Sequence, residues 1–116
     1  MKSYTDIEQS KMLAEILPLE SADYFHAPDA GVVVTEPYEI NEGDETFIAA
    51  YKGAIPCWSL AALFSMLPKS AYLEKGASTE LCRLTLPVEL ISSNWNLEPI
   101  DACVAVIEDL HEQKLL

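Results

Sequence analysis

The 116-residue sequence predicts an α+β fold in a single domain, residues 1–116. Three segments have the apolar spacing of helices, and they lie near the start, the middle and the end of the chain. A predicted hairpin between the last two helices requires antiparallel strands, and helices and strands do not alternate as they do in a doubly wound sheet. We therefore expect a small antiparallel sheet of about three to four strands with about three helices packed on it.

The first helix is expected in the segment YTDIEQSKMLAEILP, with its cap at Thr5. It cannot run past Leu17, because Pro18 prevents it from continuing. Thr5 and Glu8 have the spacing of a capping box, in which each side chain bonds the backbone amide of the other residue. This helix is amphipathic and needs a surface to pack on. Its apolar side comprises Ile7, Met12, Leu13, Ile16 and Leu17.

Loops and strands are expected in the next part of the chain. Residues 19–45 combine prolines and glycines with acidic residues, which indicates loops around a short strand at Val32 to Thr35. Residues 46–53 alternate so that both faces of a strand would be apolar, which suits an inner strand that ends at Gly53.

The middle helix, residues 58–67, has only two polar side chains, Ser59 and Ser65, and stops at Pro68. A helix that is apolar nearly all round is either buried on several sides or keeps a face for another chain. Trp58 and Phe64 are therefore candidate interaction residues. Together with the unprotected edges expected of a small sheet, this helix predicts a homodimer.

The last third of the chain predicts a hairpin and a helix. The hairpin has its loop at Lys75 to Thr79, and its second strand alternates so that Cys82, Leu84 and Leu86 share one face. Residues 88–91 either extend a strand or form an irregular crossing. The final helix starts at Pro99, with Asp101 in its first turn. Its apolar stripe is Ile100, Cys103, Val104, Ile107 and Leu110, and its solvent side carries Glu108, Asp109 and Glu112.

The charge of the chain is strongly negative, at −12, with 19 Asp and Glu against seven Lys and Arg. Such a surface repels phosphates, so we expect no direct binding of nucleic acid. The acidic loop, residues 20–45, admits three interpretations, which are a device for solubility, a surface for a basic protein partner, and a mimic of nucleic acid. The candidate interaction residues there are Glu36, Glu39, Glu42, Asp44 and Glu45.

Cys57 is a candidate reactive thiol, because a cysteine just ahead of a helix can ionise more easily. A cysteine nucleophile also needs a base, and the chain offers only His26, in the acidic loop, and His111, near the end of the last helix. Isolated cysteines are mostly buried, so a packed or capping Cys57 is the alternative. His26 with Asp23 and Asp29 could in principle hold a divalent metal. Their spacing fits neither a calcium-binding loop nor an H-x-x-x-H zinc pair, so we expect neither a metal nor a cofactor.

The compartment is predicted from segments that the sequence lacks. No apolar run approaches the roughly 20 residues that span a bilayer, and the first ten residues have no apolar signal-peptide region. We expect a cytoplasmic protein without membrane association. Its three cysteines, at wide spacings and odd in number, are expected to be reduced.

Three segments of the chain resemble small uncharacterised proteins of phages, prophages and mobile elements of gut bacteria. The segments are YTDIEQSKMLAEILPLESADYF, IPCWSLAALFSMLP and DACVAVIEDLHEQKLL. The resemblance implies a phage or mobile-element origin, and it carries over no activity or catalytic residue. The sequence thus predicts a non-enzymatic, acidic protein-interaction module. The alternatives are a small enzyme using Cys57 or the acidic loop, and a nucleic-acid mimic that inhibits a DNA-binding protein.

Overall fold

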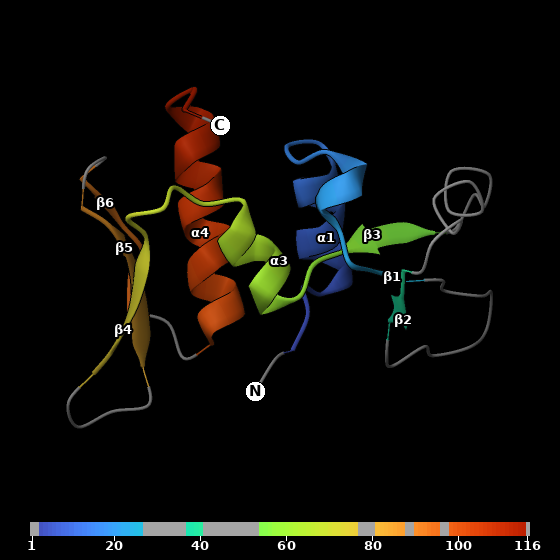
Figure 1. Cartoon of the computed structure of the whole chain (residues 1–116), viewed down its shortest axis with the longest axis horizontal. Helices are drawn as coiled ribbons and strands as arrows, with labels where there is room; N and C mark the ends of the chain where they lie inside the picture. Colours follow the sequence, from blue (N-terminus) through green and yellow to red (C-terminus); the bar gives the residue numbers. More distant parts are fainter. Residues whose placement is uncertain are drawn as a thin grey trace.

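The computed structural model describes residues 3–26, 37–40, 54–76, 81–87, 90–95 and 98–115 (Figure 1). The α+β class is confirmed in these residues. The predicted strands at 32–35 and 46–53 lie outside the described residues. The elements in chain order are α1 (Ile7–Ala14), a 3-10 turn (Leu19–Ser21), β1 (Tyr24–His26), β2 (Tyr38–Glu39), β3 (Ile55–Cys57), α3 (Leu60–Ser65), β4 (Tyr72–Lys75), β5 (Cys82–Leu86), β6 (Ile91–Ser92) and α4 (Pro99–Glu112).

The described strands form two antiparallel sheets, where the sequence predicted one. Their orders are β2-β1-β3 and β4-β5-β6, and the described α-helices lie between the two sheets in Figure 1. Part of the reason is Pro56 at the centre of β3, opposite Phe25. Proline lacks a backbone N–H, so it is confined to edge strands. The first sheet therefore ends at β3, and the hairpin forms a separate sheet.

Helix α1 is shorter than the sequence predicted. It begins at Ile7, one residue later than a cap at Thr5 implies, and it ends at Ala14 and not at Leu17. Its capping box is made by Asp6 and Gln9, so the predicted box of Thr5 and Glu8 is wrong. Thr5 is instead drawn into the core, because its amide donates to the Trp58 carbonyl at 3.0 Å and its side-chain oxygen accepts from the Trp58 amide at 3.1 Å. This pairing holds the start of α1 against the chain that follows β3.

Helix α3 is short, and other parts of the same chain cover it on several sides. Ser59 is its N-cap and accepts from the Ala62 amide at 3.2 Å. Figure 1 places α3 between α4 and α1. Leu63 is fully buried, and Phe64 is half-buried against the core. Most of the apolar surface predicted around this helix is thus covered by other parts of the same chain.

The predicted hairpin and final helix are confirmed, and they form most of the core. The β4 and β5 strands pair antiparallel, and in β5 the residues Cys82, Leu84 and Leu86 are buried while the two between them are partly exposed. Pro99 occupies the first turn of α4 as expected. Helix α4 packs on β5 and α3, and its buried residues are Ile100, Ala102, Cys103, Val104, Val106, Ile107 and Leu110.

The cap of α1 gives a direct test of the corrected helix start. Replacing Asp6 with alanine removes the side chain that bonds the Gln9 amide at 2.8 Å, and we expect it to lower the free energy of unfolding by about 1 kcal/mol. Glu8→Gln is the matched control, with an expected change within about 0.5 kcal/mol. Urea denaturation followed by circular dichroism measures both. A larger loss for Glu8→Gln than for Asp6→Ala would contradict the assignment.

Candidate functional site

Cys57, the candidate thiol, is fully buried at the end of β3. Its Sγ donates to the carbonyl oxygen of Thr5 at 3.5 Å. Burial raises the pKa of the Cys57 thiol to about 11, although hydrogen bonds to Thr5 and Ser10 act in the opposite direction. At neutral pH the side chain is therefore a thiol and not the thiolate that nucleophilic chemistry requires.

The structure brings His26 to the same place as Cys57, which the sequence alone did not predict. His26 is buried on β1, and its Nε2 lies 3.0 Å from the carbonyl oxygen of Thr5. A carbonyl only accepts, so Nε2 carries a proton and donates it to this bond. Both Cys57 and His26 thus donate to one oxygen. In a catalytic pair the imidazole would instead accept the proton of the thiol.

Asp23, the acidic neighbour of His26 in the sequence, supports the start of α3. One carboxylate oxygen accepts from the Ser59 amide at 2.9 Å, and the other accepts a short hydrogen bond from the Ser59 hydroxyl. Asp29 lies outside the described residues. Within the part of the chain that the structure describes, no group of three or more His, Cys, Asp or Glu side chains is placed to hold a metal ion.

The other candidate interaction residues occupy different environments. Trp58 is fully buried and its Nε1 donates to the Ser21 hydroxyl at 2.9 Å, so it does not lie on the exposed surface. Phe64 is half-buried against the core. Glu39 is exposed on β2. The remaining four acidic candidates, Glu36, Glu42, Asp44 and Glu45, lie outside the described residues.

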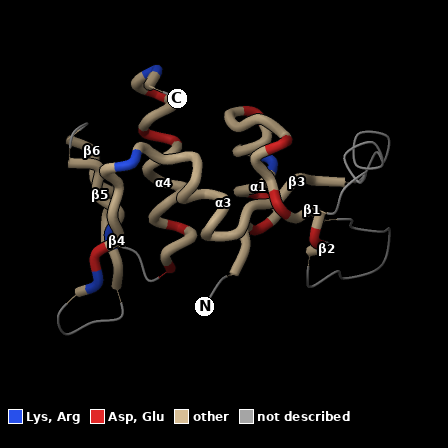
Figure 2. Tube along the Cα trace, viewed as in Figure 1, with Lys and Arg blue, Asp and Glu red and all other residues tan. Residues whose placement is uncertain are grey.

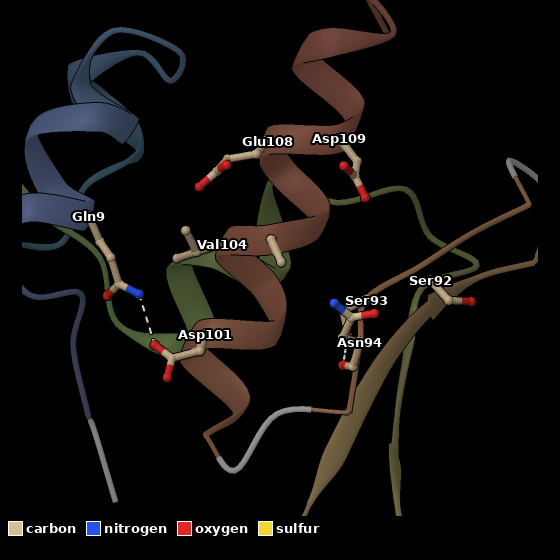
Figure 3. Close-up of a pocket in the computed structure, with 9 residues that line it drawn as sticks. Gln9, Ser92, Ser93, Asn94, Asp101, Val104, Glu108 and Asp109 are labelled. Carbon is tan, nitrogen blue, oxygen red and sulfur yellow. Dashed lines mark hydrogen bonds between the residues drawn. The ribbon is translucent and has the colours of Figure 1, made fainter.

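A hollow of about 360 Å³ lies on the solvent side of α4, between α1 and the end of the second sheet (Figure 3). Three carboxylates of α4 line it, and Figure 3 shows Glu108 extending towards α1 and Asp109 towards the side of Ser93. At the α1 side, Gln9 donates to the third carboxylate, Asp101, at 2.8 Å. The complete lining is Gln9, Ser92, Ser93, Asn94, Asp101, Val104, Ala105, Glu108 and Asp109.

A second hollow, of about 190 Å³, lies between the end of α1 and the last turns of α4. The two hollows share Glu108, and we call them together the acidic groove. The second is lined by Met12, Glu15, Ile16, Glu108, His111 and Glu112. The acidic groove thus carries carboxylates at positions 15, 101, 108, 109 and 112, and no lysine or arginine of the described residues lines either hollow.

The acidic groove has a partly apolar floor. Val104 is almost fully buried, and Met12 of α1 and Ile16, just after α1, are packed against the core. Lysine and arginine have long aliphatic stems that lie on apolar surface while the charged end reaches a polar partner. The apolar floor of the groove therefore fits the aliphatic stem of such a side chain, and its carboxylates fit the charged end.

The sequence contained part of the signal for this site. The apolar stripe of the last helix predicts that Glu108, Asp109 and Glu112 lie on its solvent side. The position of α1 beside α4 was not predictable from local sequence, because the two helices lie at opposite ends of the chain. This position brings Glu15 and Gln9 to the same surface and turns a charged helix face into a groove.

The high pKa of Cys57 leads to a prediction for stability at alkaline pH. In the unfolded chain the thiol ionises near its ordinary pKa, whereas in the folded protein it stays neutral up to about pH 11. Its contribution to stability is therefore complete below the ordinary pKa. It is lost as the pH rises towards 11, at up to about 1.4 kcal/mol per pH unit.

The matched variant is Cys57→Ala. We expect the free energy of unfolding of the wild type to fall more steeply than that of Cys57→Ala between the ordinary thiol pKa and pH 11, in urea titrations at several pH values. Equal slopes would contradict a neutral, buried thiol. So would labelling of folded Cys57 by iodoacetamide faster than that of a free thiol at pH 7.

Comparisons with known proteins find no match. No protein-family model, no curated protein and no solved structure matches the chain. In the described residues, no helix has the length and apolar character needed to cross a membrane.

Proposed function

We propose that this protein is a non-enzymatic interaction module that binds a lysine- or arginine-rich segment of a protein partner in the acidic groove. The single observation that supports the proposal most is the lining of the groove, which has five carboxylates over a partly apolar floor and no lysine or arginine among the described residues. Glu15, Glu108, Asp109 and Glu112 form no ion pair within the described part of the chain. A basic partner would supply the missing counter-charges.

The distribution of the basic residues supports the same proposal. Three of the five described Lys and Arg, at positions 69, 75 and 83, lie on or near β4 and β5 (Figure 2). The other two, Lys11 on α1 and Lys114 just after α4, line neither hollow of the acidic groove. Arg83 on β5 is paired with Glu74 on β4 at 3.1 Å. The net charge of −12 adds a long-range attraction for basic proteins and repels phosphate backbones. Charge complementarity of this kind increases the rate of association and selects against acidic partners.

Two alternatives receive less support from the geometry. An enzyme using Cys57 would need a thiolate and an accepting base, whereas the Thr5 carbonyl receives hydrogen bonds from both Cys57 and His26. A nucleic-acid mimic would also bind a basic protein, so it is a special case of the proposed function. It differs in one result, because DNA would displace the mimic from its partner by competing for the same site.

The proposed setting of the protein is the cytoplasm of a cell that carries a phage or mobile element. The three cysteines at positions 57, 82 and 103 are free and buried, which fits a reducing compartment. The phage or mobile-element origin rests on the sequence resemblance and stays a prediction.

The acidic groove is tested by neutralising it. Lys/Arg-rich peptides that bind the wild type are first selected from a peptide array. We expect the triple variant Glu108→Gln, Asp109→Asn, Glu112→Gln to bind these peptides at least about tenfold more weakly. Each lost hydrogen bond to a charged group contributes about 1.5–3 kcal/mol. Fluorescence anisotropy at two salt concentrations measures the affinity. Binding to the wild type should weaken as salt increases, because the charges are screened.

The matched control neutralises three exposed carboxylates outside the groove, with Glu8, Glu20 and Glu39 all changed to glutamine. This variant has the same net charge as the groove variant, so a purely non-specific attraction would weaken equally in both. A larger loss in the control than in the groove variant would move the binding site away from α4. If both variants lost the same affinity for the peptides, the groove would not be the binding site, and the negative charge would serve solubility.

A further inference from the structure

The outer edge of β4 has backbone groups without a partner in the described chain. In an antiparallel pair, residues alternate between those that bond the neighbouring strand and those that point away from it. The Gly76 amide donates to the Leu81 carbonyl at 2.9 Å, which places that pair in the bonded class. By alternation, Glu74 and Tyr72 also bond β5, and the backbone groups of Leu73 and Lys75 point away from the sheet.

The third strand of the sheet gives an independent check of this pattern. Leu84 lies opposite Leu73, and its carbonyl accepts from the Ser93 amide at 2.9 Å on the far side of β5. Its amide also turns that way, donating to the Ser93 hydroxyl at 3.0 Å. Leu84 therefore does not bond Leu73, and the sheet order β4-β5-β6 leaves β4 at an edge. An edge of this kind is a template for another strand.

We propose that two copies of the chain pair antiparallel through their β4 edges, with Leu73 of one copy opposite Leu73 of the other. The two three-stranded sheets then become one continuous six-stranded sheet. Each Leu73 exchanges two backbone hydrogen bonds with its counterpart, and the Lys75 amide of each copy faces Ala71 of the other.

The charges on β4 select this register. Hydrogen bonds between the two copies form only where outward-pointing residues of β4 lie opposite each other. Three registers meet this condition, and they pair Leu73 with Leu73, Leu73 with Lys75, or Lys75 with Lys75. The second sets Glu74 against Glu74, and the third sets two lysines together, which is unfavourable. The Leu73 register brings together two apolar side chains and sets Tyr72 opposite Glu74.

The overall charge favours this surface over the others for self-association. Two chains of charge −12 repel each other, so they approach best where the local charge is least negative. Three of the five described Lys and Arg lie on or near β4 and β5 (Figure 2), and Lys69 and Lys75 are exposed there. Tyr72 also exposes 46% of its surface, which pairing would reduce.

The variant Lys75→Pro tests the pairing, because it removes an amide that points away from β5. Proline is tolerated at such edge positions, so the fold should be retained. Lys75→Ala is the matched control, since it loses the same side chain but keeps the amide. In sedimentation equilibrium over a concentration series, we expect the wild type and Lys75→Ala to approach twice the chain mass of 12.8 kDa. We expect Lys75→Pro to dimerise at least about tenfold more weakly.

A cross-linking experiment tests the register and remains decisive if the proline variant fails to fold. A mixture of Tyr72→Cys and Glu74→Cys chains should form a disulfide-linked dimer on mild oxidation, and neither variant should do so alone. Glu74→Cys chains that cross-link with each other would overturn the Leu73 register. A wild type that stays monomeric at every concentration, or a folded Lys75→Pro that dimerises like Lys75→Ala, would overturn the dimer.

Salt separates this inference from the proposed function. Added salt screens the repulsion between two acidic chains and should strengthen the dimer, whereas it should weaken the binding of a basic segment in the acidic groove. The groove lies on α4 and α1, so Lys75→Pro should leave peptide binding unchanged. If Lys75→Pro loses dimerisation but keeps peptide binding, the result supports the pairing through β4 and leaves the proposed function unaffected.

Discussion

The packing of one side of α4 against β5 and α3 is the constraint on which the rest of the structure depends. Ile100, Cys103 and Ile107 are fully buried, and they share the core with the inward residues of β5. Rotating α4 would expose this apolar stripe, at a cost of about 1.5–3 kcal/mol for each large side chain. The opposite side of the helix, with Glu108, Asp109 and Glu112, is thereby held towards solvent and α1.

The second wall of the acidic groove depends on how α1 is anchored. The Thr5 amide and hydroxyl pair with the Trp58 backbone, and Gln9 then reaches Asp101 at 2.8 Å. The carbonyl of the same Thr5 accepts from His26 and Cys57. The interactions that position α1 for the groove thus involve the same residue that contacts the buried, protonated thiol. The shape of the groove and the burial of Cys57 thus depend on one local arrangement around Thr5.

Local patterns predicted the elements whose residues interact with near neighbours in the sequence. The alternation of β5 and the apolar stripe of α4 were both correct, because each depends on one periodic face. The cap of α1 was wrong by one residue, since the backbone pairing of Thr5 with Trp58 joins positions far apart in the chain. The division into two sheets and the acidic groove were not predictable for the same reason. Both depend on contacts between distant segments.

The central claim, that a basic segment binds between α1 and α4, is tested most directly by nuclear magnetic resonance. A ¹⁵N-labelled chain is titrated with a Lys/Arg-rich peptide, and the chemical-shift changes of the amides are mapped on the structure. We expect the largest changes in residues 9–16 and 101–112, around the two hollows. Changes confined to residues 20–45, or spread evenly over all acidic residues, would contradict the claim.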